Sequence, residues 1–318
     1  MLKNKKIFIT GGAGFIGSAL TSRLIEKNEI VIYDTLQRNA IKETNLLNHP
    51  NLTLVQGNVL DSEKLKEVVK GSDIIIHLAA VAGIDTVIKS PTTTTKVNMI
   101  GAYNVLEAAT KLDNLERFIY FSTSEVFGSY AYKLNEKDNT TIGEVGEARW
   151  TYAISKLAGE HLAYSYSSEF GIPIVIIRPF NIYGPGQVGE GAIHIFITRA
   201  IKNEDIQIHG DGDQIRSWCY IDDIVDGTLL CIEKKEALQN IFNIGNPRGT
   251  ITILSLAQLV VRICESKSKI VFVPKPYVDV ELRIPNIEKA KKLLGYEPKI
   301  DLEEGIKRTA DWYRRKMK

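Results

Sequence analysis

Near its start the chain reads Thr10-Gly11-Gly12-Ala13-Gly14-Phe15-Ile16-Gly17, between an apolar run at 7–9 and a stretch with helical character from Ser18. The spacing of Gly11, Gly14 and Gly17 is typical of the loop between the first strand and the first helix of a dinucleotide-binding unit. Glycine permits a sharp turn, and it lets bare backbone approach a pyrophosphate closely. The amino end of the following helix attracts the phosphates. We therefore expect a dinucleotide to contact Gly11, Gly14, Phe15, Ile16 and Gly17.

Asp34 closes the next apolar run, twenty residues after Gly14. A carboxylate at this spacing accepts hydrogen bonds from the hydroxyls of an adenosine ribose, and it repels a 2′-phosphate. Asp34 therefore favours NAD over NADP as the cofactor.

Composition and charge exclude several classes of protein. The 318 residues are 44% hydrophobic, enough for a large core, and 40 basic against 38 acidic side chains leave a net charge of +2. That balance predicts no nucleic-acid surface, and no apolar run approaches the roughly 18 residues of a membrane span. The three cysteines lack metal-ligand spacing and are odd in number, which favours a reducing, cytoplasmic location without a metal site.

Apolar runs alternate with amphipathic stretches along the first half of the chain. We expect strands at 30–33, 52–56, 74–78, 118–122 and 172–177, and helices at 62–69, 95–111 and 152–169. Such alternation predicts an α/β fold with a Rossmann-type, doubly wound parallel sheet. The regularity ends near Arg178. We therefore expect a cofactor domain at 1–178, rejoined by a strand near 241–245, and a smaller mixed α/β substrate lobe at 179–318.

Tyr152 and Lys156 are four residues apart, so a helix carries both on one face. A phenol with a pKa near 10 is a poor base at neutral pH, but a lysine ammonium and an oxidised nicotinamide nearby both favour the phenolate. Lowering the pKa by about three units takes roughly 4 kcal/mol. We expect Tyr152 to be a catalytic acid–base and Lys156 to tune it and hold the nicotinamide ribose.

Thr123, Ser124 and Glu125 follow the expected strand at 118–122, at the sheet edge where open α/β folds bind ligands. Thr123 is placed to hydrogen-bond the hydroxyl that Tyr152 deprotonates. Glu125 is a candidate general base, because a carboxylate at the rim of such a site is able to take a proton from carbon.

The chain resembles the extended short-chain dehydrogenases/reductases, the NAD-dependent nucleotide-sugar epimerases, dehydratases and decarboxylases, nearly from end to end. Further matching motifs are 57–61, His77-Leu78-Ala79-Ala80, Asn98, Arg178-Pro179-Phe180-Asn181-Ile182-Tyr183-Gly184-Pro185, 216–223 and 289–296. The resemblance implies that Asn58 and Val59 contact adenine, that Ala79, Ala80 and Asn98 lie at the cofactor, and that Asn181, Arg216 and Arg283 hold the nucleotide diphosphate. It also implies a homodimer formed by the helices at 95–111 and 152–170. Asn58 stands where the family usually has aspartate.

The reaction type is less well determined than the family. In the reactions that this resemblance implies, Tyr152 first removes the C4 hydroxyl proton, and a 4-keto sugar forms. We favour a dehydratase acting by 4,6-elimination on a UDP-linked hexose, with Glu125 removing the C5 proton; 5,6-elimination is a variant. Ser124 replaces an aspartate found in many dehydratases of this family. The alternatives are a UDP-glucuronate decarboxylase, a 4-epimerase and a non-enzymatic NAD sensor.

Overall fold

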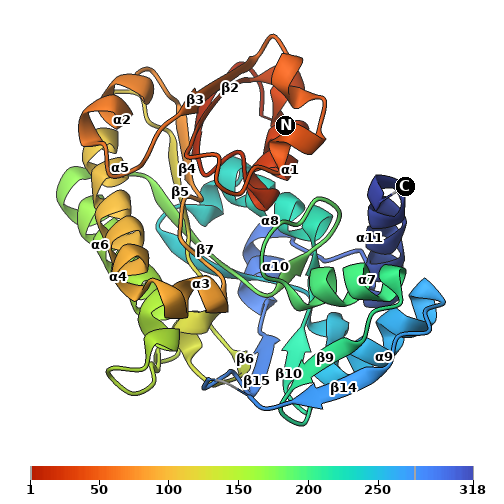
Figure 1. Ribbon diagram of the computed structural model, residues 1–318. Coiled ribbons are helices and arrows are strands. Elements are labelled where there is room, and N and C mark those ends of the chain that lie inside the picture. The colour runs from red at the N-terminus through yellow and green to blue at the C-terminus, as the bar shows by residue number, and fades with distance from the viewer. Residues whose placement is uncertain (1, 276, 318) are drawn as a thin grey trace.

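A computed structural model describes residues 2–275 and 277–317 (Figure 1). Its centre is a seven-stranded sheet in which every neighbouring pair is parallel. The strands, in spatial order, are β12 (Asn240–Ile244), β7 (Ile174–Pro179), β5 (Arg117–Phe121), β4 (Ile74–His77), β1 (Lys6–Thr10), β2 (Glu29–Asp34) and β3 (Leu52–Gln56). The expected Rossmann-type α/β fold is confirmed.

Both faces of this sheet are covered by helices, which is why its strands are almost continuously apolar. Ile7 and Ile9 pack on the face that holds α1 (Phe15–Leu24) and α8 (Ile221–Glu233). Phe8, between them, packs on the opposite face with α2 (Ser62–Val68), α5 (Gly101–Ala109) and α6 (Thr151–Phe170). Successive side chains of β1 thus point into two separate hydrophobic cores, one on each face of the sheet, between the sheet and the helix layers of Figure 1.

The second lobe is built on a four-stranded sheet with the order β13 (Thr250–Thr252), β10 (Ile215–Ser217), β15 (Leu282–Pro285) and β6 (Tyr130–Leu134). Two smaller parallel pairs join β9 (Ile206–His209) to β14 (Ile270–Val273) and β8 (Ile182–Tyr183) to β11 (Cys219–Tyr220). Its helices include α7 (Ala192–Lys202), α9 (Ile253–Cys264) and α11 (Leu302–Met317), which lie on the right of Figure 1. Helix α10 (Glu288–Leu294), at the centre of Figure 1, packs instead against β12 and α8.

The chain crosses between the lobes several times. β12 forms the edge of the large sheet beside β7, and α8 belongs to the same lobe through the Arg23–Asp226 ion pair of 2.7 Å. In the other direction, β6 belongs to the first half of the chain but lies in the second lobe, where it pairs with β15. β12 lies where a strand rejoining the cofactor domain was expected, near 241–245, and the pairing of β6 with β15 is a further crossing between the lobes.

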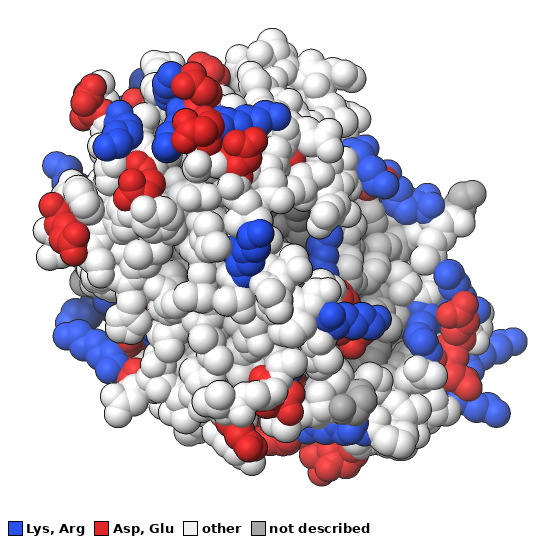
Figure 2. Space-filling model, turned by 60° about the vertical axis from the view of Figure 1, so that its left-hand side comes forward, with Lys and Arg blue, Asp and Glu red and all other residues white. Residues whose placement is uncertain are grey.

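The surface carries no large region of one charge on the face shown in Figure 2, where Lys and Arg side chains lie among Asp and Glu side chains. Within 2–275 and 277–317, no helix combines the length and the apolar character needed to cross a membrane.

Candidate active site

The glycine loop after β1 forms a cradle of closely packed backbone, which leaves no room for a side chain at Gly11 or Gly17. Gly11 has a φ of 72°, and a Cβ placed on it would lie 2.6 Å from the backbone nitrogen of Ala79. A Cβ on Gly17 would lie 2.5 Å from the Cα of Gly12. Gly14 caps α1 without a side-chain hydrogen bond, so the first N–H groups of that helix, at Phe15 and Ile16, keep their capacity to bind an anion. The cradle fits a dinucleotide pyrophosphate.

Asp34 stands at the carboxyl end of β2, beside this cradle. Its Oδ2 accepts a hydrogen bond of 3.0 Å from the backbone N–H of Ala13, and its Oδ1 accepts one of 2.8 Å from Leu36. Burial raises the pKa of the Asp34 carboxyl, and these backbone donors oppose that rise. The carboxylate is thus fixed in orientation at the position expected for the adenosine ribose.

Asn58, Val59, Ala79 and Ala80 follow β3 and β4 at the same edge of the sheet. Val59 is buried, and its carbonyl oxygen accepts a hydrogen bond of 2.8 Å from Asn104. The Asn58 side chain accepts one of 3.0 Å from the N–H of Leu60, which shapes the loop. Their contacts with adenine and with the cofactor remain predictions.

Asn98 lies in a π-helical turn, Lys96–Ile100, that interrupts the single helix expected at 95–111. The interruption separates α4 (Pro91–Thr95) from α5. The Asn98 amide bonds to the backbone N–H and C=O of Val81 and donates to Ser155 Oγ at 3.0 Å. It therefore ties the loop after β4 to α6. Single π turns are frequent at functional sites.

Tyr152 and Lys156 lie in the first turns of α6. The Lys156 Nζ donates a hydrogen bond of 2.8 Å to the carbonyl oxygen of Phe121, at the end of β5. Burial lowers the pKa of Lys156 to about 7, and the charge of Glu160 opposes that shift. Burial raises the pKa of Tyr152, as does the charge of Glu125, against a hydrogen bond with Thr123. Without its cofactor, Tyr152 is therefore a protonated phenol.

The Lys156 shift makes stability depend on pH. Because the folded pKa is about 7 and the ordinary value is 10.5, the unfolded chain binds more protons between these values, and stability rises with pH across this window. Lys156→Met removes the unfavourable free energy of burying a protonated lysine. In urea unfolding of nucleotide-free protein, we expect its gain over the parent to be largest below pH 7 and to shrink towards pH 10. Lys111→Met, at an exposed position, is the control. A gain independent of pH would contradict the assignment.

Thr123 and Ser124 are buried at η5 (Ser124–Phe127), directly after β5. The Thr123 Oγ1 accepts a hydrogen bond of 3.1 Å from the backbone N–H of Glu125 and so begins the turn. A hydrogen bond with Thr123 opposes the rise in the pKa of Tyr152, so the two hydroxyl groups lie near each other. The contact of Thr123 with a substrate hydroxyl remains a prediction.

Glu125 is held by arginine. Arg149, in η6 (Ala148–Trp150), makes a bidentate hydrogen bond to the Glu125 carboxylate. Its Nη1 donates to Oε2 at 2.5 Å and its Nη2 donates to Oε1 at 3.2 Å. Arg283 Nη1 lies 3.7 Å from the same carboxylate. Burial raises the pKa of Glu125, but the nearby guanidinium groups prevail and lower it. A carboxylate in this state is a weaker base than an isolated one.

Arg216 and Arg283 occupy paired positions on the neighbouring strands β10 and β15. Like charges facing each other on adjacent strands are unfavourable, so this pair calls for an anion. Asp279 supplies part of it, with an oxygen 3.3 Å from Arg216 Nη2. Asn181, with a φ of 42°, donates from its amide to the Ser217 carbonyl of β10 at 2.8 Å. Binding of a diphosphate by these residues remains a prediction.

Sequence reasoning missed two arginines. Arg149 stands three residues before Tyr152, a spacing that brings side chains together once the helix begins. Arg38, in the loop after β2, is close enough for its charge to lower the pKa of Tyr152. Its guanidinium also lies 3.7 Å from Glu190, in the loop before α7. Neither arginine is part of the glycine-loop motif or of the Tyr152–Lys156 pair, so these motifs did not point to them.

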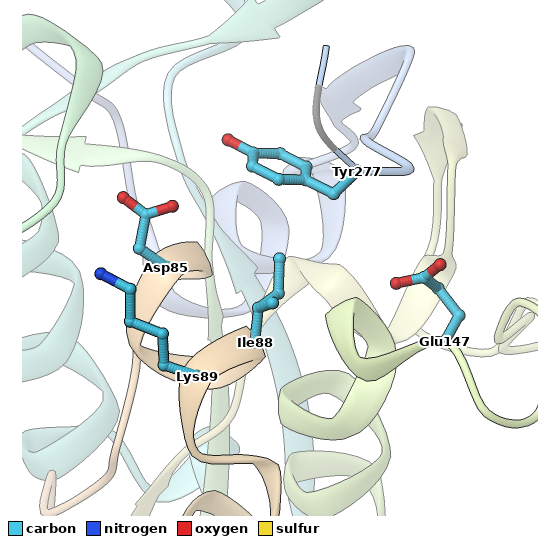
Figure 3. A pocket seen from close by; sticks show the side chains of 5 residues that line it. All are labelled: Asp85, Ile88, Lys89, Glu147 and Tyr277. Carbon is cyan, nitrogen blue, oxygen red and sulfur yellow. The ribbon is translucent and has the colours of Figure 1, made fainter.

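A pocket of about 240 Å³ opens beside this cluster (Figure 3). Asp85, Ile88 and Lys89 reach it from α3 (Ile84–Lys89), with Tyr277 and Glu147 on the other sides. The charges of Asp279, Asp85 and Arg149 act on the Tyr277 hydroxyl, which connects the pocket to the arginines. None of the residues expected to be catalytic lines it.

Residues 7–245 match the model of the NAD dependent epimerase/dehydratase family. The chain belongs to this family. It is 33% identical to UDP-N-acetyl-α-D-glucosaminuronate decarboxylase of Bacillus cytotoxicus, covering 98% of both chains, and 33% identical to dTDP-D-glucose 4,6-dehydratase of Dictyostelium discoideum, covering 98% of this chain and 82% of that one. The solved UDP-glucuronic acid 4-epimerase of Bacillus cereus, in complex with UDP-glucuronic acid and NAD, has a TM-score of 0.89 and 28% identity, covering 98% of this chain and 99% of that chain.

These findings confirm the family and NAD as its cofactor. They support an NAD-dependent activity on a nucleotide sugar. The relatives are named for decarboxylation, dehydration and epimerisation, so the family alone leaves the reaction open.

Proposed function

We propose that this protein decarboxylates a UDP-linked hexuronic acid, the alternative to dehydration in the sequence analysis. The two-pronged contact of Arg149 with Glu125 supports this choice. Dehydration needs a base that removes the C5 proton, and a carboxylate whose pKa is lowered by guanidinium groups is poorly suited to that role. Decarboxylation needs no such base, because a carboxylate β to a ketone leaves as carbon dioxide. The electron pair of the broken C5–C6 bond passes to the C4 oxygen.

The residues of the chain divide the remaining work. Tyr152 takes the proton of the C4 hydroxyl, and Thr123, which is hydrogen-bonded to it, aligns that hydroxyl. NAD, when bound by the glycine cradle and Asp34, supplies the acceptor for the C4 hydride. Lys156, fixed on the Phe121 carbonyl, brings a positive charge towards the same place when protonated. Tyr152 returns its proton to the C4 oxygen and so stabilises the enolate as carbon dioxide leaves. C5 then takes a proton that originates in water, which re-forms the C4 ketone. Return of the hydride to C4, with the Tyr152 proton, would give the UDP-pentose and restore the oxidised cofactor.

A 4,6-dehydratase is the second candidate, and one observation favours it. The charge of Glu125 acts on Tyr152, so the carboxylate lies close to where C4 and C5 would be bound. If substrate draws Arg149 away from Glu125, the carboxylate regains basicity.

A panel of nucleotide sugars distinguishes these reactions. The purified protein is incubated in deuterated water, without added cofactor, with UDP-glucuronate, UDP-N-acetylglucosaminuronate, UDP-glucose and dTDP-glucose, and products are followed by NMR. We expect carbon dioxide and a UDP-pentose carrying deuterium at C5 from an acid substrate. A 4-keto-6-deoxy product from a neutral hexose would establish the dehydratase instead. Inversion at C4 alone would establish an epimerase, and NAD binding without turnover of the panel would favour a sensor.

We also propose that the protein is a homodimer formed through α5 and α6. Tyr103 of α5 meets Tyr166 of α6 edge-on at 6.3 Å, and Tyr166 meets Phe170 at 5.3 Å. Tyr103 is 46% exposed and Phe170 56% exposed, which is unusual for large rings on adjacent helices. A second copy of the same face would cover them.

The double variant Tyr103→Glu/Phe170→Glu is expected to be a monomer, because it buries two charges in the proposed interface. Light scattering coupled to size-exclusion chromatography measures the mass. Phe272→Glu is the matched control, since Phe272 is 55% exposed on β14 of the other lobe. A parent protein that already runs as a monomer would refute the proposal.

A further inference from the structure

Arg149 lies among charged side chains, but one of its N–H hydrogen-bond donors has no acceptor. Its side chain is 3% exposed, and its two Nη atoms contact the carboxylate of Glu125. Its Nε is buried and has no hydrogen-bond partner among the described residues. A guanidinium presents five N–H donors, and a buried donor without an acceptor is unfavourable. Glu125 meets the two Nη atoms, and Asp279 Oδ1 lies 3.8 Å from Nη2, but Nε has no acceptor among the described residues.

The charges around Arg149 favour an anion in that place. Three guanidinium groups gather here, those of Arg149, Arg216 and Arg283. Glu125 and Asp279 are the carboxylates within 4.0 Å of them among the described residues, so one positive charge is uncompensated. Arg283 Nε is likewise buried without a partner. The three guanidinium groups therefore favour the binding of an anion in addition to the Glu125 and Asp279 carboxylates.

The position of Arg149 distinguishes it from the two other arginines. Arg216 and Arg283 lie on paired strands of the second lobe, where a diphosphate is expected. Arg149 instead stands at the start of α6, three residues before Tyr152, and its charge acts on the Tyr152 hydroxyl. If Tyr152 acts at C4, a group beside it lies near the substituents of the two neighbouring ring carbons, C3 and C5. In a hexuronic acid, C6 on C5 is the one of these substituents that is an anion.

We infer that Arg149 binds the C6 carboxylate of the substrate through its Nε edge and so selects a hexuronic acid over a neutral hexose. The inference rests on the proposed function for the identity of the reacting carbon. The end-on contact with Glu125 keeps the guanidinium oriented, and it is the bidentate geometry in which arginine recognises carboxylates. Glu125 is then a positioning residue for Arg149 rather than a base.

Ligand binding tests this directly. NAD-loaded protein carrying Tyr152→Phe, which is expected to slow turnover strongly, is titrated by calorimetry with UDP, UDP-glucose and UDP-glucuronate. Adding Arg149→Gln is expected to weaken UDP-glucuronate binding by about 10- to 100-fold, the loss of a hydrogen bond to a charged group. Binding of UDP and UDP-glucose should change by less than about threefold. Arg149→Lys should recover only part of the loss, because an ammonium lacks the planar fork.

Arg283→Gln is the matched control, and it should weaken all three ligands alike if Arg283 holds the diphosphate. Equal weakening of the three ligands by Arg149→Gln, or no weakening, would overturn the inference. Because Arg149→Gln leaves Glu125 short of a partner, the double variant Arg149→Gln/Glu125→Gln is titrated as well, and it should show the same selective loss. The outcome is separable from the proposed function: selective binding without release of carbon dioxide refutes decarboxylation alone, and release of carbon dioxide without selectivity at Arg149 refutes this inference alone.

Discussion

Tyr152→Phe is expected to lower turnover by about 100- to 10 000-fold, the usual contribution of a positioned general acid–base group. The substitution removes one oxygen atom, the one that is hydrogen-bonded to Thr123, and leaves the ring in place. Turnover is measured on whichever nucleotide sugar the panel identifies, and NAD content is measured alongside to show that the cofactor site is intact.

Tyr164→Phe provides the comparison within the same helix. The Tyr164 hydroxyl donates to the carbonyl of Gln239 at 3.4 Å, away from the cofactor edge, so its removal should leave turnover nearly unchanged. If Tyr152→Phe kept more than a tenth of the activity, the acid–base role would have to pass to another group.

Glu160→Gln is expected to cost about 3–5 kcal/mol of unfolding free energy, because it leaves a buried guanidinium without its counter-charge. Glu160 and Arg178 are each 3% exposed, and their side chains meet twice, at 2.8 Å and 2.6 Å. Ser122 donates a further hydrogen bond to the same carboxylate. This pair lies one helical turn beyond Lys156, between α6 and β7.

Urea unfolding measures the loss of unfolding free energy. Two further variants show whether this loss comes from the unpaired buried charge. Glu160→Leu/Arg178→Met, which removes both charges, should regain most of the stability, since apolar pairs replace buried ion pairs well. Glu304→Gln breaks an exposed ion pair with Arg308 on α11 and should change stability little. A loss from Glu160→Gln as small as that from Glu304→Gln would show that the buried charge is compensated in another way.

The strands and the glycine loop were predictable because local sequence determines them. The strand expected at 52–56 has the same bounds in the structure. The glycine spacing, taken with the flanking strand and helix and with Asp34, indicated the loop after β1. The π turn was not predicted, because residues 95–111 have a continuous helical pattern. The bonds that Asn98 of this turn makes, to Val81 and Ser155, join residues far apart in the sequence.

The electrostatics of the site were less accessible to sequence reasoning. The contact between Arg149 and Glu125 joins residues 24 positions apart, and Arg283 reaches the same carboxylate from a strand of the other lobe. No periodic pattern reports such contacts. The low pKa required of Tyr152 is also absent from the protein alone, where burial raises it, so its activation depends on groups that the sequence does not contain.

Because the two lobes are interleaved, we expect them to unfold as a single thermodynamic unit. Severing the chain after residue 178 would strip β12 from the edge of the large sheet and β15 from its partner β6, and the exposed backbone edges would invite aggregation. Neither half is then an independent folding unit. A ligand that binds mainly one lobe is consequently expected to raise the melting temperature of both, so occupancy by a nucleotide should protect α9 of the second lobe from unfolding as well.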